Sequence, residues 1–419
     1  MPACSPIVVI GGGAAGMMAA GRAGELGAKV LLIEKNKKLG CKLLITGKGR
    51  CNVTNNGDLD TFIQSYHGKG RFLYSALNHF FHDDLTELLK QYGVNLKVER
   101  GGRLFPVSDK AADVVQALNQ YCQRHKVEIH TGEEVLALIT EEGRVKGIKT
   151  DKGFVACKSV VIATGGKSYA ATGSTGDGYK WVAALGHTVI PPRPALVPLN
   201  IQESWAKELQ GLSLKNVEVK LIQGERVLGK EFGEMLFTHF GVSGPVILTL
   251  SYLVVEKATQ QGLHLEINLK PALNDEQLDQ RLQRDLQKYQ RKQLQNALVD
   301  LLPQRLIPVV IALSKLQPTK FAHQITKEER RNIVKVLQKL QMNVLGPRSL
   351  AEAIITAGGI SLQEINSGTM ESKLIQGLYF AGEVLDIDGY TGGFNLQAAF
   401  STGYLAGERA AFKLRANAH

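Results

Sequence analysis

Residues 7–16, Ile-Val-Val-Ile-Gly-Gly-Gly-Ala-Ala-Gly, decide the fold of this 419-residue chain. The run opens with four β-branched residues, which predict a short buried strand, and the glycines after it predict a tight turn. The alanine-rich residues 14–26 predict a helix, and residues 30–33 predict a second strand that ends at Glu34. A strand, a glycine turn, a helix and a second strand together indicate a βαβ unit.

The three glycines at positions 11, 13 and 16 have the spacing G-x-G-x-x-G between a strand and a helix, which is typical of a dinucleotide site. We expect Gly11 to permit the turn, Gly13 to let a pyrophosphate approach the backbone, and Gly16 to allow close helix packing. Glu34 is expected to accept hydrogen bonds from both hydroxyls of an adenosine ribose, and its charge disfavours the 2′-phosphate of NADP. The predicted contacts at this end are Gly11, Gly13, Ala14, Ala15, Gly16, Glu34 and Lys35.

The composition is that of an ordinary folded protein. Hydrophobic residues make up 44% and charged residues 21%, which excludes a disordered chain, and the length predicts two or three domains. The net charge of +11 favours anionic ligands. No signal peptide, membrane span or metal-ligand spacing is recognised, and the five cysteines lack a CxxC pair, so we expect a cytoplasmic protein without a metal. The cysteines are Cys4, Cys41, Cys51, Cys122 and Cys157.

Glycine-rich sequence occurs at both ends of the chain, and a different composition lies between them. The predicted organisation is an end domain in two parts, residues 1–194 and 351–419, split by an inserted domain at 195–350. Within the end domain, short apolar runs over 127–163 predict an antiparallel meander that leads into a strand at 160–163.

The inserted domain is predicted to be β-rich over 195–270 and helical over 275–345. Strand patterns occupy 211–269, and amphipathic helical patterns occupy 276–302 and 327–340. The glycine-rich pattern then returns, with a predicted strand at 377–381 and a helix that begins near residue 393.

Three later segments indicate which dinucleotide is bound. Residues 160–166, VVIATGG, resemble the strand-to-loop segment of two-dinucleotide-binding flavoproteins, and residues 378–383, LYFAGE, resemble their C-terminal flavin motif. In that motif an acidic residue, here Glu383, holds the ribityl chain. Residues 392–397 begin a helix whose N–H groups can face the edge of a reduced, anionic flavin. We therefore predict FAD and an α/β, Rossmann-like FAD domain with a parallel sheet and an antiparallel meander.

Longer segments extend the resemblance over nearly the whole chain. Residues 45–55, 174–179, 237–245 and 382–397 resemble the BaiN-like, YhiN-type family of bacterial FAD-dependent oxidoreductases. That family includes aminoacetone-oxidase-type proteins and a proposed reductase of steroid-like enones. The chain departs from the family pattern at Cys41, where arginine or a similar residue is usual, and at Ala170, where proline is common.

The resemblance implies further cofactor contacts, with the loop 46–55 against the flavin and the backbone of Val135 at the adenine. The implied residues are Lys42, Thr46, Gly47, Arg50, Cys51, Asn52, Val53, Val135, Ala163, Thr164, Gly165, Gly166, Gly382, Glu383, Gly393, Asn395, Leu396 and Gln397. A second G-x-G-x-x-G is absent from the sequence after residue 163, so NADH or NADPH would bind only transiently as an electron donor.

Four residues are candidates for the chemistry. His239 is the best histidine for proton transfer, although a core histidine bonded to the backbone is the alternative. Lys48 and Arg50 are cations that could stabilise a flavin anion or a substrate carboxylate, or only support their loop. Tyr169 is a weaker proton donor.

Two other features of the sequence have both a functional and a structural interpretation. A helix that begins at Asp177 could direct N–H donors at a substrate, and an ordinary Asp N-cap is the alternative. Cys41 and Cys51 could form a redox dithiol, but nine residues with two glycines separate them, which favours Cys51 as a small neighbour of the flavin.

The favoured function is two-electron transfer between FAD and a small organic substrate. The reaction is either NAD(P)H-linked reduction of an activated double bond or oxidation of an amine or amino-ketone. The alternatives are a tRNA-modifying flavoprotein that uses the basic residues near 281–292 and 330–331, and a flavin-binding sensor without turnover. A nucleic-acid partner is the less favoured interpretation, and the oligomeric state stays open.

Overall fold

The computed structural model describes residues 6–256 and 262–416, which fold into two compact units. The glycine-rich unit comprises residues 1–194 and 353–419, and the inserted unit comprises residues 195–352. Cys4 lies outside the described residues.

A five-stranded parallel sheet forms the centre of the glycine-rich unit, in the order β19-β10-β1-β2-β6. Most of these strands are buried along their whole length, which is typical of a parallel sheet covered on both faces. The strands are β1 (Ile7–Ile10), β2 (Val30–Glu34), β6 (Glu128–Thr131), β10 (Ser159–Ile162) and β19 (Leu378–Phe380).

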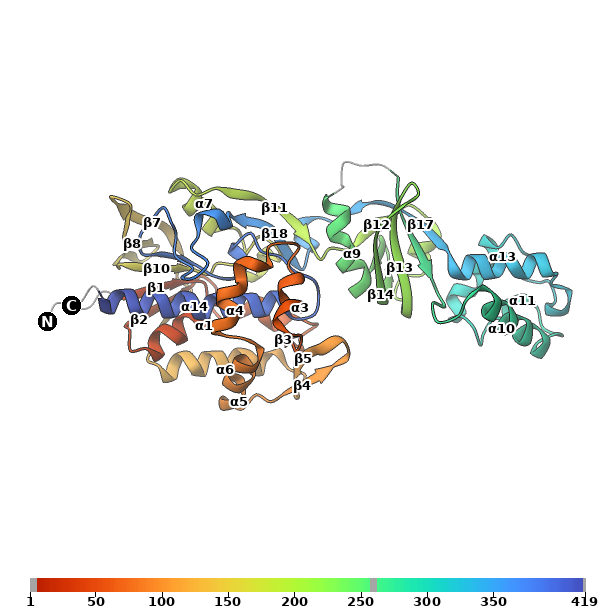
Figure 1. Cartoon of the computed structure of the whole chain (residues 1–419), viewed down its shortest axis with the longest axis horizontal. Helices are drawn as coiled ribbons and strands as arrows, with labels where there is room; N and C mark the ends of the chain where they lie inside the picture. Colours follow the sequence, from red (N-terminus) through yellow and green to blue (C-terminus); the bar gives the residue numbers. More distant parts are fainter. Residues whose placement is uncertain (1–5, 257–261, 417–419) are drawn as a thin grey trace. The chain divides into compact units, whose positions relative to one another are not determined.

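Alternate residues of β1 face the two sides of the sheet. Ile7 and Val9 pack with the helices α1, α6 and α14, whereas Val8 and Ile10 pack with the antiparallel meander β7-β8-β9. Figure 1 shows the helices and the meander on opposite sides of these strands. The elements are α1 (Ala14–Glu25), α6 (Ala111–Arg124), α14 (Phe394–Ala416), β7 (Val135–Glu141), β8 (Arg144–Thr150) and β9 (Gly153–Ala156).

Shorter elements complete this unit. A three-stranded sheet has the order β3-β5-β4, and β11 pairs with β18. The bounds are α2 (Cys41–Ile45), β3 (Thr54–Asn55), α3 (Leu59–Gln64), α4 (Tyr74–His79), α5 (His82–Gln91), β4 (Leu96–Glu99), β5 (Arg103–Pro106), α7 (Asp177–Ala184), β11 (Val189–Ala195) and β18 (Ile355–Ile360).

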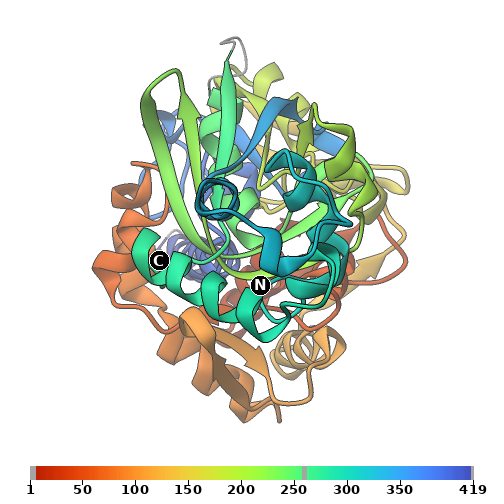
Figure 2. The same ribbon diagram turned by 90° about the vertical axis from the view of Figure 1, so that its right-hand side faces the viewer.

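The inserted unit contains a closed barrel with the strand order β12-β15-β14-β13-β16-β17 and a group of helices. Figure 2 looks onto these green strands and teal helices. The strands are β12 (Leu199–Ile201), β13 (Ser213–Gln223), β14 (Arg226–Thr238), β15 (Gly241–Ser243), β16 (Leu263–Asn268) and β17 (Leu340–Pro347). The helices are α8 (Ser204–Glu208), α9 (Pro245–Glu256), α10 (Asp275–Lys288), α11 (Leu294–Ala297), α12 (Ile307–Leu313) and α13 (Lys327–Gln338).

Two predictions for the inserted unit are wrong in detail. The predicted strand region 211–269 includes the helix α9, which begins at a proline and buries Val246, Leu250 and Val254 at helical spacing. The predicted helical region 275–345 includes part of β17, which closes the barrel. Leu340 and Met342 are buried while Gln341 between them is exposed, which is the two-residue period of a strand.

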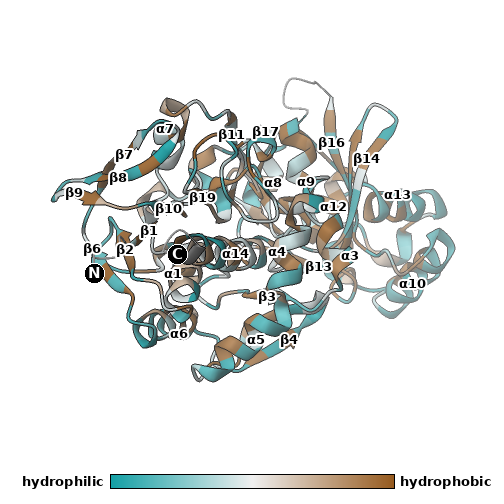
Figure 3. Ribbon diagram, turned by 60° about the vertical axis from the view of Figure 1, so that its left-hand side comes forward, coloured by the Kyte–Doolittle hydropathy of each residue, from teal (hydrophilic) through white to brown (hydrophobic). Residues whose placement is uncertain are grey.

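The helix predicted at 276–302 is also divided, because α10 ends at Lys288 and α11 begins only at Leu294. α10 is amphipathic as expected, with Leu278, Leu282 and Leu286 buried. Figure 3 shows hydrophilic and hydrophobic residues side by side on α10 and α13. Among the described residues, none of the helices combines the length and the apolar character that crossing a bilayer requires.

Candidate functional site

The glycine turn between β1 and α1 packs closely against backbone at Gly11 and Gly16 and is open at Gly13. A Cβ atom at Gly11, where φ is +105°, would lie 2.4 Å from the carbonyl oxygen of Ala163, and one at Gly16 would lie 1.8 Å from that of Gly11. A Cβ atom at Gly13 would meet no atom within 4 Å. α1 has no acidic residue in its first turn and no side-chain cap, so its first N–H groups face this open space. The turn therefore fits an anion such as a pyrophosphate.

Glu34 is fixed beside this turn at the end of β2. One carboxylate oxygen accepts the N–H of Gly12 at 2.7 Å, and the other accepts both the backbone N–H and the side-chain amide of Asn36, at 2.8 and 2.7 Å. The oxygen bonded to Gly12 can accept one further hydrogen bond, so the carboxylate still fits a ribose hydroxyl. Asn36 is not among the residues predicted from the sequence, although an Asn two residues after the acidic strand end is a visible signal.

Lys35 forms an ion pair with Asp177, with 2.7 Å between its ammonium nitrogen and the carboxylate. Gly176, not Asp177, is the N-cap residue of α7. The N-cap alternative for Asp177 is therefore wrong, because its side chain is turned toward Lys35.

Glu383 lies at the meeting point of four chain segments. One of its carboxylate oxygens accepts a hydrogen bond from Lys42 at 2.7 Å, and the other accepts the N–H of Thr356 at 2.8 Å and the hydroxyl of Ser168 at 3.1 Å. Lys42 also donates to the Ser168 hydroxyl at 2.8 Å. Ser168 and Thr356 were missed in the sequence because they meet Glu383 only through the fold.

The start of α14 is held against the strand β3. Gly393 has a φ of +102°, and a Cβ atom there would lie 2.3 Å from the carbonyl oxygen of Thr54. The Asn52 side chain, oriented as its neighbours require, accepts the N–H of Gly393 at 3.0 Å, and Asn55 donates to the carbonyl of Gly392 at 3.0 Å. The loop implied to contact the flavin is thereby fixed to the N-terminus of α14.

Two side chains near this helix start point elsewhere. Gln397 is fully buried, and its amide oxygen accepts the hydroxyl of Thr54 at 2.6 Å. Asn395 bonds the N–H and the carbonyl of Gly389, at 2.8 and 2.9 Å. Their side chains order the protein locally, so any contact to a cofactor in this arrangement comes from the backbone.

α1 and α14 run side by side through small residues. A Cβ atom at Gly403 would lie 2.3 Å from the carbonyl oxygen of Ala15, and one at Gly407 would lie 2.2 Å from that of Ala19. A step of four residues along α14, from Gly403 to Gly407, corresponds to a step of four residues along α1, from Ala15 to Ala19, so the two helices run in the same direction. α14 begins nine residues before Gly403. At 1.5 Å per residue, its N-terminus projects about 13 Å beyond a point level with Ala15. Two positive helix ends therefore follow one another along one edge of this unit.

The two candidate cations differ in their surroundings. The Arg50 guanidinium donates to Glu99 and Asp109 and lies over the ring of Phe105, 4.2 Å from its centre. The hydrogen bonds with Glu99 and then Asp109 raise the pKa of Arg50. Lys48 is exposed in a left-handed backbone conformation with a φ of +58°. Arg50 thus has two anionic partners of its own, and a flavin role for either cation stays a prediction.

The two proton-transfer candidates lie in different units. His239 is exposed in the turn between β14 and β15 of the inserted unit, with its ring 4.8 Å from that of Phe240. Tyr169 is half-buried in the glycine-rich unit, and its carbonyl accepts the N–H of Thr172 at 2.8 Å. Their catalytic roles stay predictions.

The cysteine pair has the surroundings of structural thiols. Cys51 is buried, and burial raises its pKa to about 12. Cys41 is partly exposed, and its thiol donates to the carbonyl of Lys38 at 3.3 Å. Within 6–256 and 262–416, no group of three His, Cys, Asp or Glu side chains is placed to hold a metal ion.

All predicted site residues except His239 belong to the glycine-rich unit. The remaining ones lie at the start of α1, in the loop before β3, at the start of β7, in the loop after β10, in the segment after β19 and in the first turn of α14. They are Ala14, Thr46, Gly47, Val53, Val135, Thr164, Gly165, Gly166, Gly382 and Leu396.

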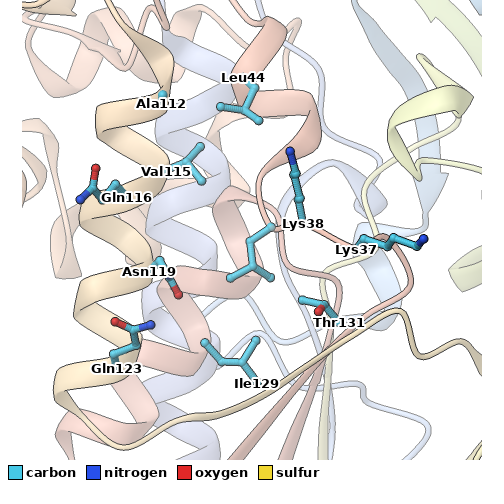
Figure 4. Close-up of a pocket in the computed structure, with 11 residues that line it drawn as sticks. Lys37, Lys38, Leu44, Ala112, Val115, Gln116, Asn119, Gln123, Ile129 and Thr131 are labelled. Carbon is cyan, nitrogen blue, oxygen red and sulfur yellow. The ribbon is translucent and has the colours of Figure 1, made fainter.

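A groove of about 510 Å³ lies beside this site, between α6 and the loop that follows β2. Figure 4 shows Val115 and Asn119 of α6 facing Lys38 and Thr131 across it. None of the predicted cofactor residues lines this groove, so it is separate from the glycine turn.

The parallel sheet, the open glycine turn and the two projecting helix ends define the class of protein: a dinucleotide-binding α/β protein interrupted by an inserted unit. The family model described as HI0933-like protein Rossmann domain matches residues 5–409, and the chain belongs to this family. The resemblance inferred from the sequence motifs is thus confirmed at the level of the family.

Two curated relatives match over nearly their whole length. The chain is 33% identical over 97% of its length, and 98% of the relative, to a 3-dehydro-bile acid delta(4,6)-reductase of Clostridium scindens. It is 34% identical over 95% of its length, and 96% of the relative, to a ribosomal RNA dihydrouridine synthase of Escherichia coli.

Among solved structures, the fold is similar to that of a 3-ketosteroid delta1-dehydrogenase from Sterolibacterium denitrificans. The TM-score is 0.55 with 15% sequence identity, and the match covers 97% of this chain and 99% of that one. This similarity shows that the two chains share a fold.

Proposed function

We propose that this protein binds FAD along the glycine-rich unit and uses it to reduce a carbon–carbon double bond conjugated with a carbonyl group. The offset between α1 and α14 is the observation that carries the cofactor assignment. A pyrophosphate at the N-terminus of α1 and a flavin ring at the N-terminus of α14 would be separated by a ribityl chain. The two helix starts are offset by eight residues, or about 12 Å, which is of that order.

Each end of the cofactor has matching groups in the chain. The open space at Gly13 would accommodate the pyrophosphate, and the carboxylate oxygen of Glu34 that faces Gly12 would accept a ribose hydroxyl. Glu383 would accept ribityl hydroxyls while Lys42 offsets its charge. The N-terminus of α14 would stabilise negative charge on the reduced flavin. When bound, FAD supplies hydride transfer to the substrate.

The relatives support the reaction class. A 4,6-unsaturated 3-ketone and the uracil ring of uridine both contain a carbon–carbon double bond conjugated with a carbonyl, and one reduction chemistry serves both. The chain matches relatives with these two substrates almost equally well, at 33% and 34% identity. Reduction of such a bond therefore supersedes amine oxidation, the other reaction that the sequence leaves open, as our proposal. NADH or NADPH, bound transiently, is the proposed electron donor.

RNA is a second candidate substrate, and the ribosomal RNA relatives favour it. Residues 195–352 contain 21 lysines and arginines and 16 aspartates and glutamates, so this unit is basic, but it does not hold most of the excess charge of +11. Three of the basic residues singled out from the sequence form ion pairs within the unit, which leaves fewer to contact phosphates. The pairs are Arg281 with Asp285, Lys288 with Asp300 and Arg330 with Asp279.

An anaerobic visible spectrum tests the proposal. The FAD-loaded protein should lose its oxidised-flavin absorption on addition of NADH or NADPH. The absorption should return when a 4,6-unsaturated 3-ketosteroid or a ribosomal RNA transcript without modifications is added. Recovery with the steroid alone supports a small-molecule reductase, and recovery with the transcript alone supports the RNA candidate. Gly13→Val, which fills the pyrophosphate space, is the cofactor-free control.

Failure at either stage has a definite meaning. A protein that retains no FAD would overturn the cofactor assignment. Flavin that neither acceptor reoxidises, although dioxygen does, would overturn the reduction of conjugated double bonds.

A further inference from the structure

A group of charged side chains lies behind the segment that joins Glu383 to α14. The ammonium of Lys69 is 2.6 Å from a carboxylate oxygen of Asp386 and 3.3 Å from one of Asp388. The second oxygen of Asp388 faces the ring of His67, 3.8 Å from Nε2. The loop after α3 is thereby attached to the segment before α14 by charge.

Asp388 is the unusual member of this group. Its side chain is 1% exposed, and the oxygen that faces His67 has no hydrogen-bond partner. A buried carboxylate oxygen without a hydrogen bond is costly, so it calls for an explanation in terms of function or charge. The group that this oxygen faces, the ring of His67, is itself buried, with its side chain only 3% exposed.

The ring of His67 packs edge-on against Tyr390, with 4.6 Å between the ring centres and an interplanar angle of 82°. Tyr390 itself is 37% exposed. Its N–H donates to the carbonyl of Ser65 at 3.0 Å, and its carbonyl accepts the amide of Asn395 at 3.1 Å. A fixed tyrosine at the surface thus lies in front of a buried histidine and a buried carboxylate.

Tyr390 lies in the chain between two segments that are proposed to contact the cofactor. It lies between Glu383, the proposed ribityl contact, and Gly393, which precedes the helix end proposed to face the flavin. None of the proposed FAD contacts belongs to the cluster of His67, Lys69, Asp386 and Asp388. A reduction of a conjugated double bond needs one proton donor in addition to the hydride, and a tyrosine hydroxyl is suited to that task.

We propose that Tyr390 is the proton donor of this reduction and that His67 and Asp388 are its positioning residues; the inference rests on the proposed function. The hydride adds to one carbon of the double bond, and the electron pair of that bond moves toward the carbonyl to give an enolate. The Tyr390 hydroxyl then gives its proton to the other carbon of the bond. The tyrosinate that remains regains a proton from solvent.

The test compares Tyr390→Phe with Tyr74→Phe, which removes a hydroxyl from an exposed residue of α4. The FAD-loaded protein is reduced with dithionite without oxygen and mixed with the steroid or the RNA transcript. Tyr390→Phe should slow flavin reoxidation about 100-fold or more, whereas Tyr74→Phe should match the wild type. Reoxidation by dioxygen and the affinity for FAD should be unchanged in both variants.

A second measurement separates proton donation from a structural role. In D2O the wild type should place deuterium on one face of the carbon that receives the proton, and Tyr390→Phe should place it on both faces. Asp388→Asn should slow the reaction about 10-fold at saturating acceptor with the facial preference retained, because Tyr390 is still present. His67→Asn serves the same purpose if Asp388→Asn folds poorly.

The outcomes are distinct. Unchanged rate and facial preference in Tyr390→Phe, or a loss of FAD affinity in that variant, would overturn the role of Tyr390. Wild-type protein that dioxygen reoxidises but neither acceptor does would overturn the proposed function, and the inference with it.

Discussion

The ammonium nitrogen of Lys42 lies 2.7 Å from a carboxylate oxygen of Glu383, which joins two residues 341 positions apart. Both side chains are mostly buried, at 24% and 20% exposure. The pair connects the helix α2, which contains Lys42, to the segment after β19 at the proposed ribityl chain. One ion pair therefore holds together two parts of the site on either side of the insertion.

Glu383→Ala should weaken FAD binding about 10- to 100-fold, because hydrogen bonds to a charged group contribute about 1.5–3 kcal/mol. Titration of the apoprotein with FAD, followed by flavin fluorescence, measures the change. Glu87→Ala, which alters an exposed carboxylate on α5, is the matched control. Equal affinities for both variants would contradict a ribityl contact at Glu383.

Arg50→Ala should change how stability responds to acid. Arg50 lowers the pKa of Glu99, and Lys97 followed by Arg50 lowers the pKa of Asp109. A lowered pKa in the folded state gives stability that is present above the unfolded-state pKa and is lost as the pH falls through the folded-state pKa. The difference in melting temperature between wild type and variant should therefore shrink from pH 7 to about pH 3. A difference that does not depend on pH would rule out this charge cluster as its source.

Local patterns predicted the central fold well. The βαβ unit at residues 7–34 is encoded by a buried strand run and by glycines whose spacing leaves few alternatives. The barrel was less predictable because β17 follows α13 after a single residue, and its two-residue period is short. The helix α9 was hidden within a stretch of strands, because apolar residues of that kind suit both structures.

Some residues of the candidate site could be predicted from local motifs, and others could not. Gly13 and Glu34 are identified by their place in a motif, so their surroundings could be anticipated. The anionic partners of Arg50 come from Glu99 and Asp109, which are 49 and 59 residues away. The cluster around Asp388 likewise forms only when the loop at His67 meets the segment before α14. Contacts of this kind depend on the folded chain, and a single sequence gives no signal for them.

Cys51 should resist thiol reagents in the native protein. Burial raises its pKa to about 12, so the reactive thiolate is scarce at pH 8. In the native protein, a chromogenic disulfide reagent should react with the partly exposed Cys41 and not with the buried Cys51. It should therefore detect one thiol fewer in Cys41→Ser than in the wild type, and as many thiols in Cys51→Ser as in the wild type. Rapid reaction of Cys51 would revive the dithiol interpretation. The stability gained by burying the neutral thiol is complete below its ordinary pKa and should fall as the pH rises toward 12.

The same substitution should affect different properties at Gly13 and Gly16. Alanine at Gly13 should weaken FAD binding, whereas alanine at Gly16 should lower the free energy of unfolding. A Cβ atom at Gly13 meets nothing within 4 Å, and the φ of −85° there suits any residue, so Gly13→Ala should leave the melting temperature unchanged. The added methyl group would occupy the space proposed for the pyrophosphate, so FAD affinity should fall about 10-fold or more, and further in Gly13→Val.

At Gly16 the added atom would lie 1.8 Å from the carbonyl oxygen of Gly11, which belongs to the rigid turn and cannot move aside. Gly16→Ala should therefore cost about 1–3 kcal/mol of unfolding free energy through overpacking, whether or not FAD is present. Thermal melts of both apoproteins and FAD titrations of the folded variants separate the two effects. If Gly13→Ala destabilised the apoprotein as much as Gly16→Ala, the space before α1 would belong to packing, and the pyrophosphate would have to bind elsewhere.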